Sequence, residues 1–423
     1  MVHAASDNTL KLALVGCGGR GTGAVVNALS VEGSPIRLVA MADIFELRLI
    51  NSINSLKRQF GDRIQVSEIA KFVGFDGYRK AIDSLRRGDI VIFATPAAFR
   101  WVHFSYAIER GVHVFMEPPV AVDGPTARRM IELGRLSKEQ NVNVGVGLMA
   151  RHCRARHALF ERIRNGEIGD IVHMRSYRMH GLVGSVFTER RRENLSELLW
   201  QLKRFQSFLW TSGGLFNDLY IHKIDECCWM KNNWPVRAEA LGGRHCRGDY
   251  VDQNFDNYAV EYTFEDGASF SFRGRIMVGA EDQYASYVHG SKGMGIVSSA
   301  GNFPARCRTF NGHRISRSDL IWSSSQPEKN PHDLEWEDFM NAIRGGMPYH
   351  ELERGVMAAL VASMGRKAAH TGQAVTLGEM LNDEHEFAPG IDQLSMDSPA
   401  PLQADAEGRY PVPMPGLKPL REY

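Results

Sequence analysis

Two side chains four positions apart, Asp218 and His222, are the residues of this sequence best suited to proton transfer. On a helix, side chains at this spacing lie on one face. The unperturbed pKa of histidine, about 6.5, suits proton exchange near neutral pH. Asp218 would orient the imidazole, stabilise its cation or hold a substrate hydroxyl. An isolated pair of this kind also occurs as a structural cap or a core histidine, and no third ligand for a metal is evident.

A second chemical signal is the glycine-rich segment GCGGRG at residues 16–21, which matches the pattern G-x-G-x-x-G. It follows an apolar run and precedes a predicted helix, as a dinucleotide-binding turn requires. Gly16 allows the tight turn, Gly18 lets the backbone approach a pyrophosphate, and Gly21 lets the helix pack closely on the sheet. Backbone N–H groups at the helix start, at Gly19 and Arg20, would meet the negative charge.

An acid at the end of the next predicted strand favours NAD over NADP. Asp43 lies 22 residues after Gly21, and the residues after it, Ile44 and Phe45, are not basic. A carboxylate here accepts hydrogen bonds from the ribose hydroxyls and repels a 2′-phosphate. Thr95 and Pro96 follow a later strand at the edge where ligands bind in such sheets, so we expect them to wall the nicotinamide pocket.

The elements that position these residues change character near residue 150. Before it, strands and helices alternate, which predicts a parallel sheet covered on both faces. The strands are predicted at 12–15, 36–42, 89–94, 112–116 and 142–146, and the helices at 23–29, 45–60, 97–110 and 126–139. Later runs predict a largely antiparallel sheet with strands 171–179, 237–242, 257–264, 268–276 and 283–289, and helices at 155–165, within 212–230, and at 333–343 and 351–370.

We therefore predict an α/β protein with a Rossmann dinucleotide-binding domain at 1–147, a second α/β domain for substrate binding at 148–386, and an extended C-terminal tail at 387–423. The 423 residues carry 50 basic and 49 acidic side chains and are 43% hydrophobic. This balance argues against nucleic-acid binding, and no apolar run is long enough to span a membrane. The six cysteines form no CxxC pair, so no zinc motif is predicted.

The location of the protein is open from sequence. The segment Val2-His3-Ala4 has the small-x-small shape of a cleavage site. Residence in the periplasm follows if an export signal was trimmed there, and residence in the cytoplasm is the default expectation.

The motifs in this order resemble the Gfo/Idh/MocA oxidoreductases, the family named for glucose–fructose oxidoreductase and inositol dehydrogenase. The resemblance covers about residues 11 to 370, and its motifs are residues 16–21, 94–96, 116–121 (which include Glu117) and the Gly213-Gly214…Asp218…His222…Asp225 segment. It implies a Rossmann domain followed by an α/β domain with an open, mostly antiparallel sheet. It also implies NAD(P) chemistry on sugars or polyols, and homodimers or homotetramers built through that sheet.

The resemblance also implies roles for single residues. It places Asp218 and His222 beside the substrate and Glu117 beside the cofactor. Arg151 and His152 are predicted to bind substrate near the cleft. Tyr177 is a further candidate for substrate binding, although its strand end, with Arg178 and His180, is also typical of a sheet surface.

One position departs from the family pattern. Members usually carry Glu-Lys-Pro where this chain reads Glu117-Pro118-Pro119, so Pro118 removes a cation that touches nicotinamide and substrate. Lys223 is no replacement, because one step along a helix turns the side chain about 100° away from His222. Three outcomes follow: a dehydrogenase with His222 as base, a glycosidase that uses retained NAD for transient oxidation and elimination, or a protein that binds NAD and sugar without turnover.

Overall fold

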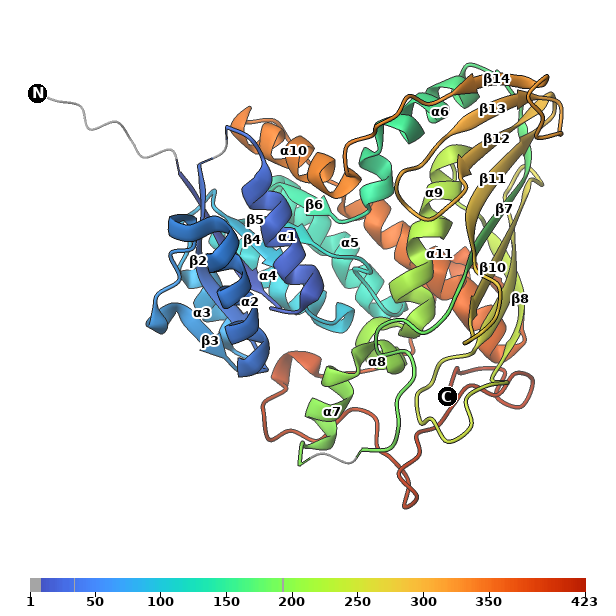
Figure 1. Ribbon diagram of the computed structural model, residues 1–423. Helices are drawn as coiled ribbons and strands as arrows, with labels where there is room; N and C mark the ends of the chain where they lie inside the picture. The colour runs from blue at the N-terminus through green and yellow to red at the C-terminus, as the bar shows by residue number, and fades with distance from the viewer. Residues whose placement is uncertain (1–8, 34, 192–193) are drawn as a thin grey trace, which may run out of the picture.

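The computed structural model describes residues 9–33, 35–191 and 194–423, and it contains two sheets (Figure 1). The segment Val2-His3-Ala4 lies outside the described residues. The first sheet has six strands in the order β3-β2-β1-β4-β5-β6, and every neighbouring pair is parallel. Its strands are β1 (Leu10–Val15), β2 (Ile36–Asp43), β3 (Lys71–Val73), β4 (Ile90–Phe93), β5 (His113–Met116) and β6 (Val144–Val146).

Helices cover both faces of this sheet, which is why its strands are almost continuously apolar. One face packs on α1 and α2, and the other packs on α3, α4 and α5. The helices are α1 (Gly19–Ser30), α2 (Glu46–Phe60), α3 (Gly77–Asp83), α4 (Arg100–Arg110) and α5 (Gly124–Glu139). The predicted parallel sheet is confirmed, and β3 and α3 are elements that the sequence pattern did not predict.

The second sheet has nine strands in the order β14-β13-β12-β11-β7-β10-β9-β8-β15. All of its neighbouring strands are antiparallel except β7 and β10, so the predicted mostly antiparallel sheet is confirmed. Its strands are β7 (Ile171–His180), β8 (Arg237–Gly243), β9 (Asn257–Thr263), β10 (Ser269–Ile276), β11 (Gln283–Gly290), β12 (Gly293–Ser298), β13 (Arg308–Asn311), β14 (Leu320–Ser323) and β15 (Val375–Thr376).

Helices α9 and α11 lie on the inner face of this sheet, between it and the first sheet (Figure 1). Because α11 is surrounded by protein, it is buried along most of its length. The helices of this part are α6 (Arg154–Arg164), α7 (Glu197–Lys203), α8 (Leu209–Ser212), α9 (Ile221–Lys231), α10 (Pro331–Arg344), α11 (Leu352–Thr371) and α12 (Leu377–Asn382). A short π-helical turn, Phe216–Tyr220, leads directly into α9.

Two segments differ from the arrangement that their sequence suggests. Helix α10, predicted within the second domain, packs Trp336, Phe339 and Met340 into the apolar cluster of the first sheet, with Trp336 stacked on Phe115. The C-terminal tail has little regular structure but is not loose, since Glu422 near its end is only 3% exposed. The domain boundary at 147 stays a prediction, and α10 shows that the chain returns to the first domain.

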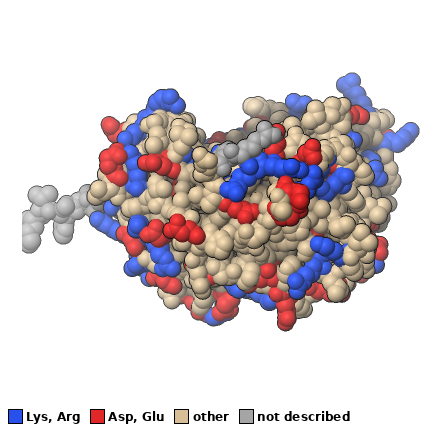
Figure 2. All heavy atoms as spheres, turned by 90° about the horizontal axis from the view of Figure 1, so that it is seen from below, with Lys and Arg blue, Asp and Glu red and all other residues tan. Residues whose placement is uncertain are grey.

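The surface mixes both signs of charge on the face that Figure 2 shows, where acidic and basic side chains lie next to one another. Of the helices in the described part of the chain, none combines the length and the hydropathy needed to cross a bilayer. The same residues contain no group of three histidine, cysteine or acidic side chains placed to hold a metal ion.

Candidate active site

The turn from β1 to α1 is built from glycines, two of which the protein's own packing requires. Gly16 has a φ of +96°, and a Cβ atom there would lie 2.6 Å from the carbonyl carbon of Ala94. A Cβ atom at Gly21 would lie 2.0 Å from the Gly16 oxygen. By contrast, a Cβ atom built on Gly18 or Gly19 meets nothing within 4 Å. The turn is therefore tight against the sheet and open where α1 begins.

The open side presents unpaired backbone donors. The first internal hydrogen bond of α1 runs from the Thr22 amide to the Gly18 oxygen over 2.9 Å, so the amides of Gly19, Arg20 and Gly21 have no carbonyl partner in the helix. No acidic side chain stands in the first turn, and no side chain caps it. The positive end of the helix dipole is thus free to bind an anion such as a phosphate group.

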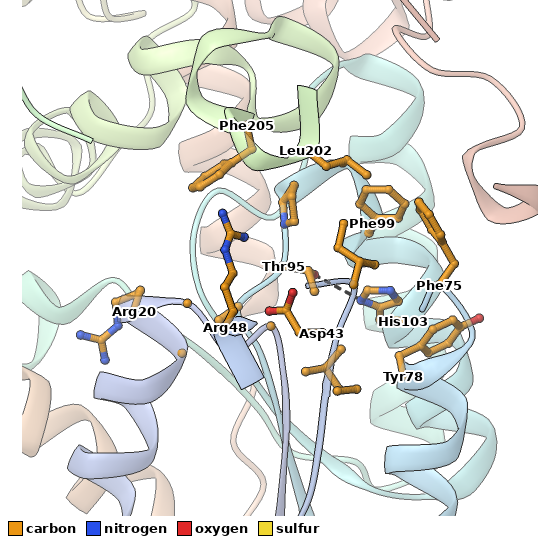
Figure 3. A pocket seen from close by; sticks show the side chains of 18 of the residues that line it. Arg20, Asp43, Arg48, Phe75, Tyr78, Thr95, Phe99, His103, Leu202 and Phe205 are labelled. Atoms are coloured by element: carbon orange, nitrogen blue, oxygen red, sulfur yellow. Dashed lines mark hydrogen bonds between the residues drawn. The ribbon is translucent and has the colours of Figure 1, made fainter. Parts of the chain in front are cut away.

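A cavity of about 250 Å³ lies against this turn. Its floor is the carboxyl edge of the parallel sheet, and Leu202 and Phe205 reach it from the second domain (Figure 3). The cavity brings together most of the predicted cofactor residues, namely Gly16, Gly18, Gly19, Arg20, Gly21, Asp43, Thr95 and Pro96. Glu117 is not among the lining residues, but its carboxylate binds Arg20 at 2.9 Å.

Asp43 lines the cavity with both carboxylate oxygens already held by backbone. Oδ2 accepts from the Cys17 amide at 2.7 Å, and Oδ1 accepts from the Phe45 amide at 2.8 Å. Burial raises the pKa of Asp43, and these backbone hydrogen bonds oppose the rise. Sequence analysis missed Arg48, which also lines the cavity and lies 4.7 Å above the Phe45 ring. Arg48 lies in the first turn of α2, five residues after Asp43, and this closeness in sequence was the available signal.

A buried arginine lies beside the end of β4. Arg100, 2% exposed, donates from Nη1 to the Thr95 hydroxyl at 2.8 Å and from Nε to the Glu117 carbonyl oxygen at 3.1 Å. The Thr95 hydroxyl also lies 3.3 Å from His103 Nδ1, and burial lowers the pKa of His103 to about 3. Thr95 therefore connects the cavity to a buried guanidinium that sequence analysis did not single out.

Asp218 lies in the π-helical turn before α9, where its Oδ2 accepts a hydrogen bond from Gln206 Nε2 at 2.6 Å. Burial raises the pKa of Asp218 to about 6, although the bond from Gln206 and the positive charges of Arg178 and Arg100 act to lower it. Its carboxyl group therefore changes charge close to neutral pH. Gln206 was not predicted from the sequence, because it reaches Asp218 from a separate segment.

Among the described residues, His222, at the start of α9, forms no hydrogen bond with Asp218. The Nδ1 atom of His222 is buried and has no hydrogen-bond partner among those residues. Burial, and then the charge of Arg178, lower the pKa of His222 to about 3, so its imidazole is neutral at physiological pH. Lys223 turns away as predicted: its Nζ is buried and binds Glu226 and Ser298, each at 2.6 Å.

Two predicted substrate residues are engaged with other parts of the protein. Arg151 forms a forked ion pair with Asp225 on α9, with Nε 2.9 Å from Oδ2 and Nη2 2.8 Å from Oδ1. His152 is buried, and its Nδ1 lies 2.8 Å from Asp338 Oδ2. The structure thus gives both side chains a role in joining helices, and neither is among the described residues that line the cavity.

Strand alternation separates Tyr177 from its neighbour Arg178. Successive side chains on a strand point to opposite faces, and Arg178 donates to the Leu219 oxygen, which lies on the side of the helices. Tyr177 therefore belongs to the other face of the sheet, away from Asp218. The end of β7 therefore faces Asp218 through Arg178 rather than Tyr177. The Arg178 guanidinium lies 5.1 Å from the centre of the Tyr284 ring.

Helix α10 adds two residues that sequence analysis missed. His332 Nδ1 lies 3.0 Å from Glu335 Oε1. Burial, followed by the charge of Arg20, lowers the pKa of His332 to about 4. Burial, followed by repulsion from Glu117, raises the pKa of Glu335 well above its usual value. Only the return of α10 to the first sheet brings this pair near the Arg20–Glu117 ion pair.

Comparison with known proteins identifies the second domain. The family model of the GFO/IDH/MocA C-terminal domain matches residues 157–295. The chain is 24% identical to D-glucoside 3-dehydrogenase of Escherichia coli (strain K12) over 68% of this chain and 79% of that protein. It is 22% identical to the rhizopine catabolism protein MocA of Rhizobium meliloti over 83% of this chain and 92% of that protein. It is also 26% identical to a glycosyl hydrolase family 109 protein of Streptomyces coelicolor, over 48% of this chain and 41% of that protein.

Solved structures share the fold over most of the chain. An aldose–aldose oxidoreductase from Caulobacter crescentus gives a TM-score of 0.66 at 18% identity, covering 87% of this chain and 99% of that one. A scyllo-inositol dehydrogenase from Lactobacillus casei, solved with NAD(H) and scyllo-inositol, gives 0.62 at 19% identity, covering 88% and 99%. These comparisons identify residues 157–295 as a C-terminal domain of the GFO/IDH/MocA type, and they show that most of the chain shares the fold of these solved structures.

Proposed function

We propose that the protein is an NAD-dependent oxidoreductase that oxidises a hydroxyl group of a sugar, polyol or glycoside, or reduces the corresponding ketone. The observation that carries this proposal is the open glycine turn, with free helix amides above a cavity that ends at Thr95. The matched family and the relatives named as dehydrogenases support it.

The residues present fit a dinucleotide. The space beside Gly18 and Gly19 admits a pyrophosphate, and the amides at the start of α1 would hold it. Asp43, Thr95 and Pro96 line the same cavity, and we assign Asp43 to the ribose hydroxyls and Thr95 and Pro96 to the nicotinamide. When bound, NAD supplies the hydride acceptor.

Proton transfer is assigned to the pair Asp218 and His222. Sequence analysis names His222 as the group that accepts the hydroxyl proton of the substrate. A neutral imidazole with a buried nitrogen that lacks a partner among the described residues supports that role. The pKa of Asp218, about 6, favours the carboxylate as a second candidate, because a group that titrates near the working pH both takes and releases protons readily. In our proposal the two side chains flank the substrate hydroxyl, and Arg151, His152 and Tyr177 act through the surrounding framework.

The experiment that tests this function begins with binding. We expect calorimetric titration of the purified full chain to show uptake of NAD, or NAD to copurify with it. Incubation with NAD and a panel of sugars, polyols and glycosides should then produce absorbance from NADH. If neither dinucleotide binds and none copurifies, the proposed function is rejected.

A redox-assisted glycosidase is the second candidate, favoured by the cover that Leu202 and Phe205 place over the cavity, which suits a retained cofactor. The similarity to a glycosyl hydrolase family 109 protein supports it. Here the hydroxyl is oxidised only transiently, the glycosidic bond is eliminated, and no NADH accumulates. Release of an aryl alcohol from aryl glycosides without NADH formation would select this candidate, and dinucleotide binding without either product would indicate a binding protein.

Cofactor choice gives a direct prediction. Changing Asp43 to Asn should raise the preference for NADP relative to NAD by roughly tenfold or more, because the repulsive charge disappears while Arg48 remains in the cavity. The measurement is kcat/KM with each dinucleotide. The matched control is Asp62→Asn on the exposed surface, and an unchanged ratio in Asp43→Asn would contradict the role given to this carboxylate.

We also propose that copies of the chain associate through the outer face of the nine-stranded sheet, as the family resemblance implies. Leu241 on β8, which is out of phase with the buried Ala238, is 79% exposed. Light scattering after size-exclusion chromatography should show a dimer or tetramer, and changing Leu241 to Glu should shift it toward the monomer.

A further inference from the structure

The buried guanidinium of Arg100 has no ion-pair partner among the described residues. Two of its nitrogens donate to neutral oxygens, those of Thr95 and Glu117, at 2.8 and 3.1 Å. The remaining nitrogen of Arg100, Nη2, has no hydrogen-bond partner among the described residues either. A buried charge is normally paired, because removing it from water is costly. An arginine that is 2% exposed and lacks a counter-ion therefore points to a ligand rather than to a structural role.

The position of Arg100 in its helix supports this interpretation. It is the first residue of α4, where the helix dipole is positive and acidic side chains are the stabilising choice. A cation here works against the stability of the helix. Of the two carboxylates whose charges act on Arg100, Glu117 is already bound to Arg20, and the other is Asp218.

Arg100 lies between the two halves of the proposed active site. On one side it holds Thr95, which lines the cofactor cavity. On the other side its charge acts on Asp218, the acid of the proton-transfer pair. None of the described residues that line the cavity is a lysine, and Lys223 is turned away and bound to Glu226. Arg20 and Arg48 also line the cavity, but the positive charges that act on Asp218 are those of Arg178 and Arg100.

We propose that Arg100 stabilises the negative charge that develops on the substrate oxygen during hydride transfer. This inference rests on the proposed function. In the oxidation, the C–H bond breaks and its electron pair leaves as hydride to NAD, the O–H proton passes to the Asp218/His222 pair, and a carbonyl bond forms between carbon and oxygen. Arg100 donates a hydrogen bond from Nη2 to that oxygen and exchanges no proton.

The chemistry of a guanidinium suits this task. Burial lowers the pKa of Arg100 to about 10, so the side chain keeps its charge at neutral pH. Its bonds to Thr95 and Glu117 fix the plane of the group before substrate arrives, and donors fixed in advance are the effective ones in a water-poor site. Pro118, which offers no donor, would then not prevent turnover.

Kinetics of Arg100 variants test the proposal in the full chain. Removal of one donor to a developing oxyanion typically slows an enzyme by roughly 10²–10³-fold, so we expect that loss in kcat for Arg100→Met, with the Kd for NAD unchanged. Arg100→Lys should retain more activity, and added guanidinium ion should partly restore an Arg100→Gly variant. Arg110→Met, exposed at the other end of α4, is the matched control.

A second measurement needs no turnover. In cofactor-free protein with isotope-labelled aspartate, the pKa of Asp218 followed by infrared spectroscopy should be higher in Arg100→Met than in wild type, because a nearby positive charge is lost. An active wild type whose Arg100→Met variant has equal kcat and the same Asp218 pKa would overturn the role of Arg100 alone. A wild type that binds no dinucleotide would overturn the proposed function, and this inference with it.

Discussion

Changing Asp218 to Asn is expected to lower turnover by roughly 10²–10⁴-fold, the usual contribution of a positioned acid or base. Asparagine preserves the size of the side chain and an oxygen that can accept from Gln206, so the loss reports the missing proton acceptor. Burial raises the pKa of Asp218 to about 6. The carboxyl group is protonated below that pH and cannot accept a proton, so the rate of oxidation in wild type should rise between pH 5 and 7.

The pH profile separates the two candidates for the proton acceptor. His222 has a pKa lowered to about 3 and is already neutral at pH 5, so a mechanism that depends on it alone gives a flat rate from pH 5 to 7. We expect the rise near pH 6 to persist at a lower level in His222→Gln and to vanish in Asp218→Asn. A wild-type profile without that rise would return the role to His222. An Asp218→Asn variant with wild-type turnover would remove the carboxylate from the chemistry.

The cofactor side of this site could be predicted from sequence because its signal is local. The glycine turn, the strand before it and the helix after it lie within one short stretch, and their geometry follows from the absence of side chains at Gly16 and Gly21. Asp43 ends the adjoining strand, and parallel strands end at the same edge. A more distant part of the chain contributes Ala94, which leaves no room for a Cβ atom at Gly16.

The substrate side was predictable only in part, because distant elements assemble it. Arg100 comes from α4, Arg178 from β7 and Gln206 from the segment after α7, and no spacing in the sequence links them to Asp218. The strand at 171–179 was predicted, but alternation along it decides that Arg178 rather than Tyr177 faces the helices. The pKa values of Asp218 and His222 depend on burial, which a sequence pattern does not supply.

The C-terminal tail, whose composition suggests a loose extension, is fixed to the core by an ion pair beside the site. Arg366 of α11 binds the Glu422 carboxylate through Nε and Nη2, each at 2.9 Å, and His370 Nδ1 lies 2.7 Å from Glu422 Oε2. Arg366 also donates to the carbonyl oxygens of Val122, at 3.2 Å, and Gly213, at 3.3 Å. The last residues of the chain thus hold the arginine that supports the glycine lead into the Asp218 turn.

Changing Glu422 to Gln should therefore destabilise the protein by about 3 kcal/mol, because it leaves the Arg366 guanidinium buried without a counter-charge. Burial alone would raise the pKa of Glu422, but Arg366 and His370 outweigh it and hold the pKa low. The stabilisation is fully present above the ordinary glutamate pKa of about 4.3 and is lost as the pH falls further. Urea unfolding at pH 7 and at pH 3 measures both effects, with the exposed Glu407→Gln as control. Equal midpoints for wild type and Glu422→Gln at pH 7 would show that the tail is not held through this carboxylate.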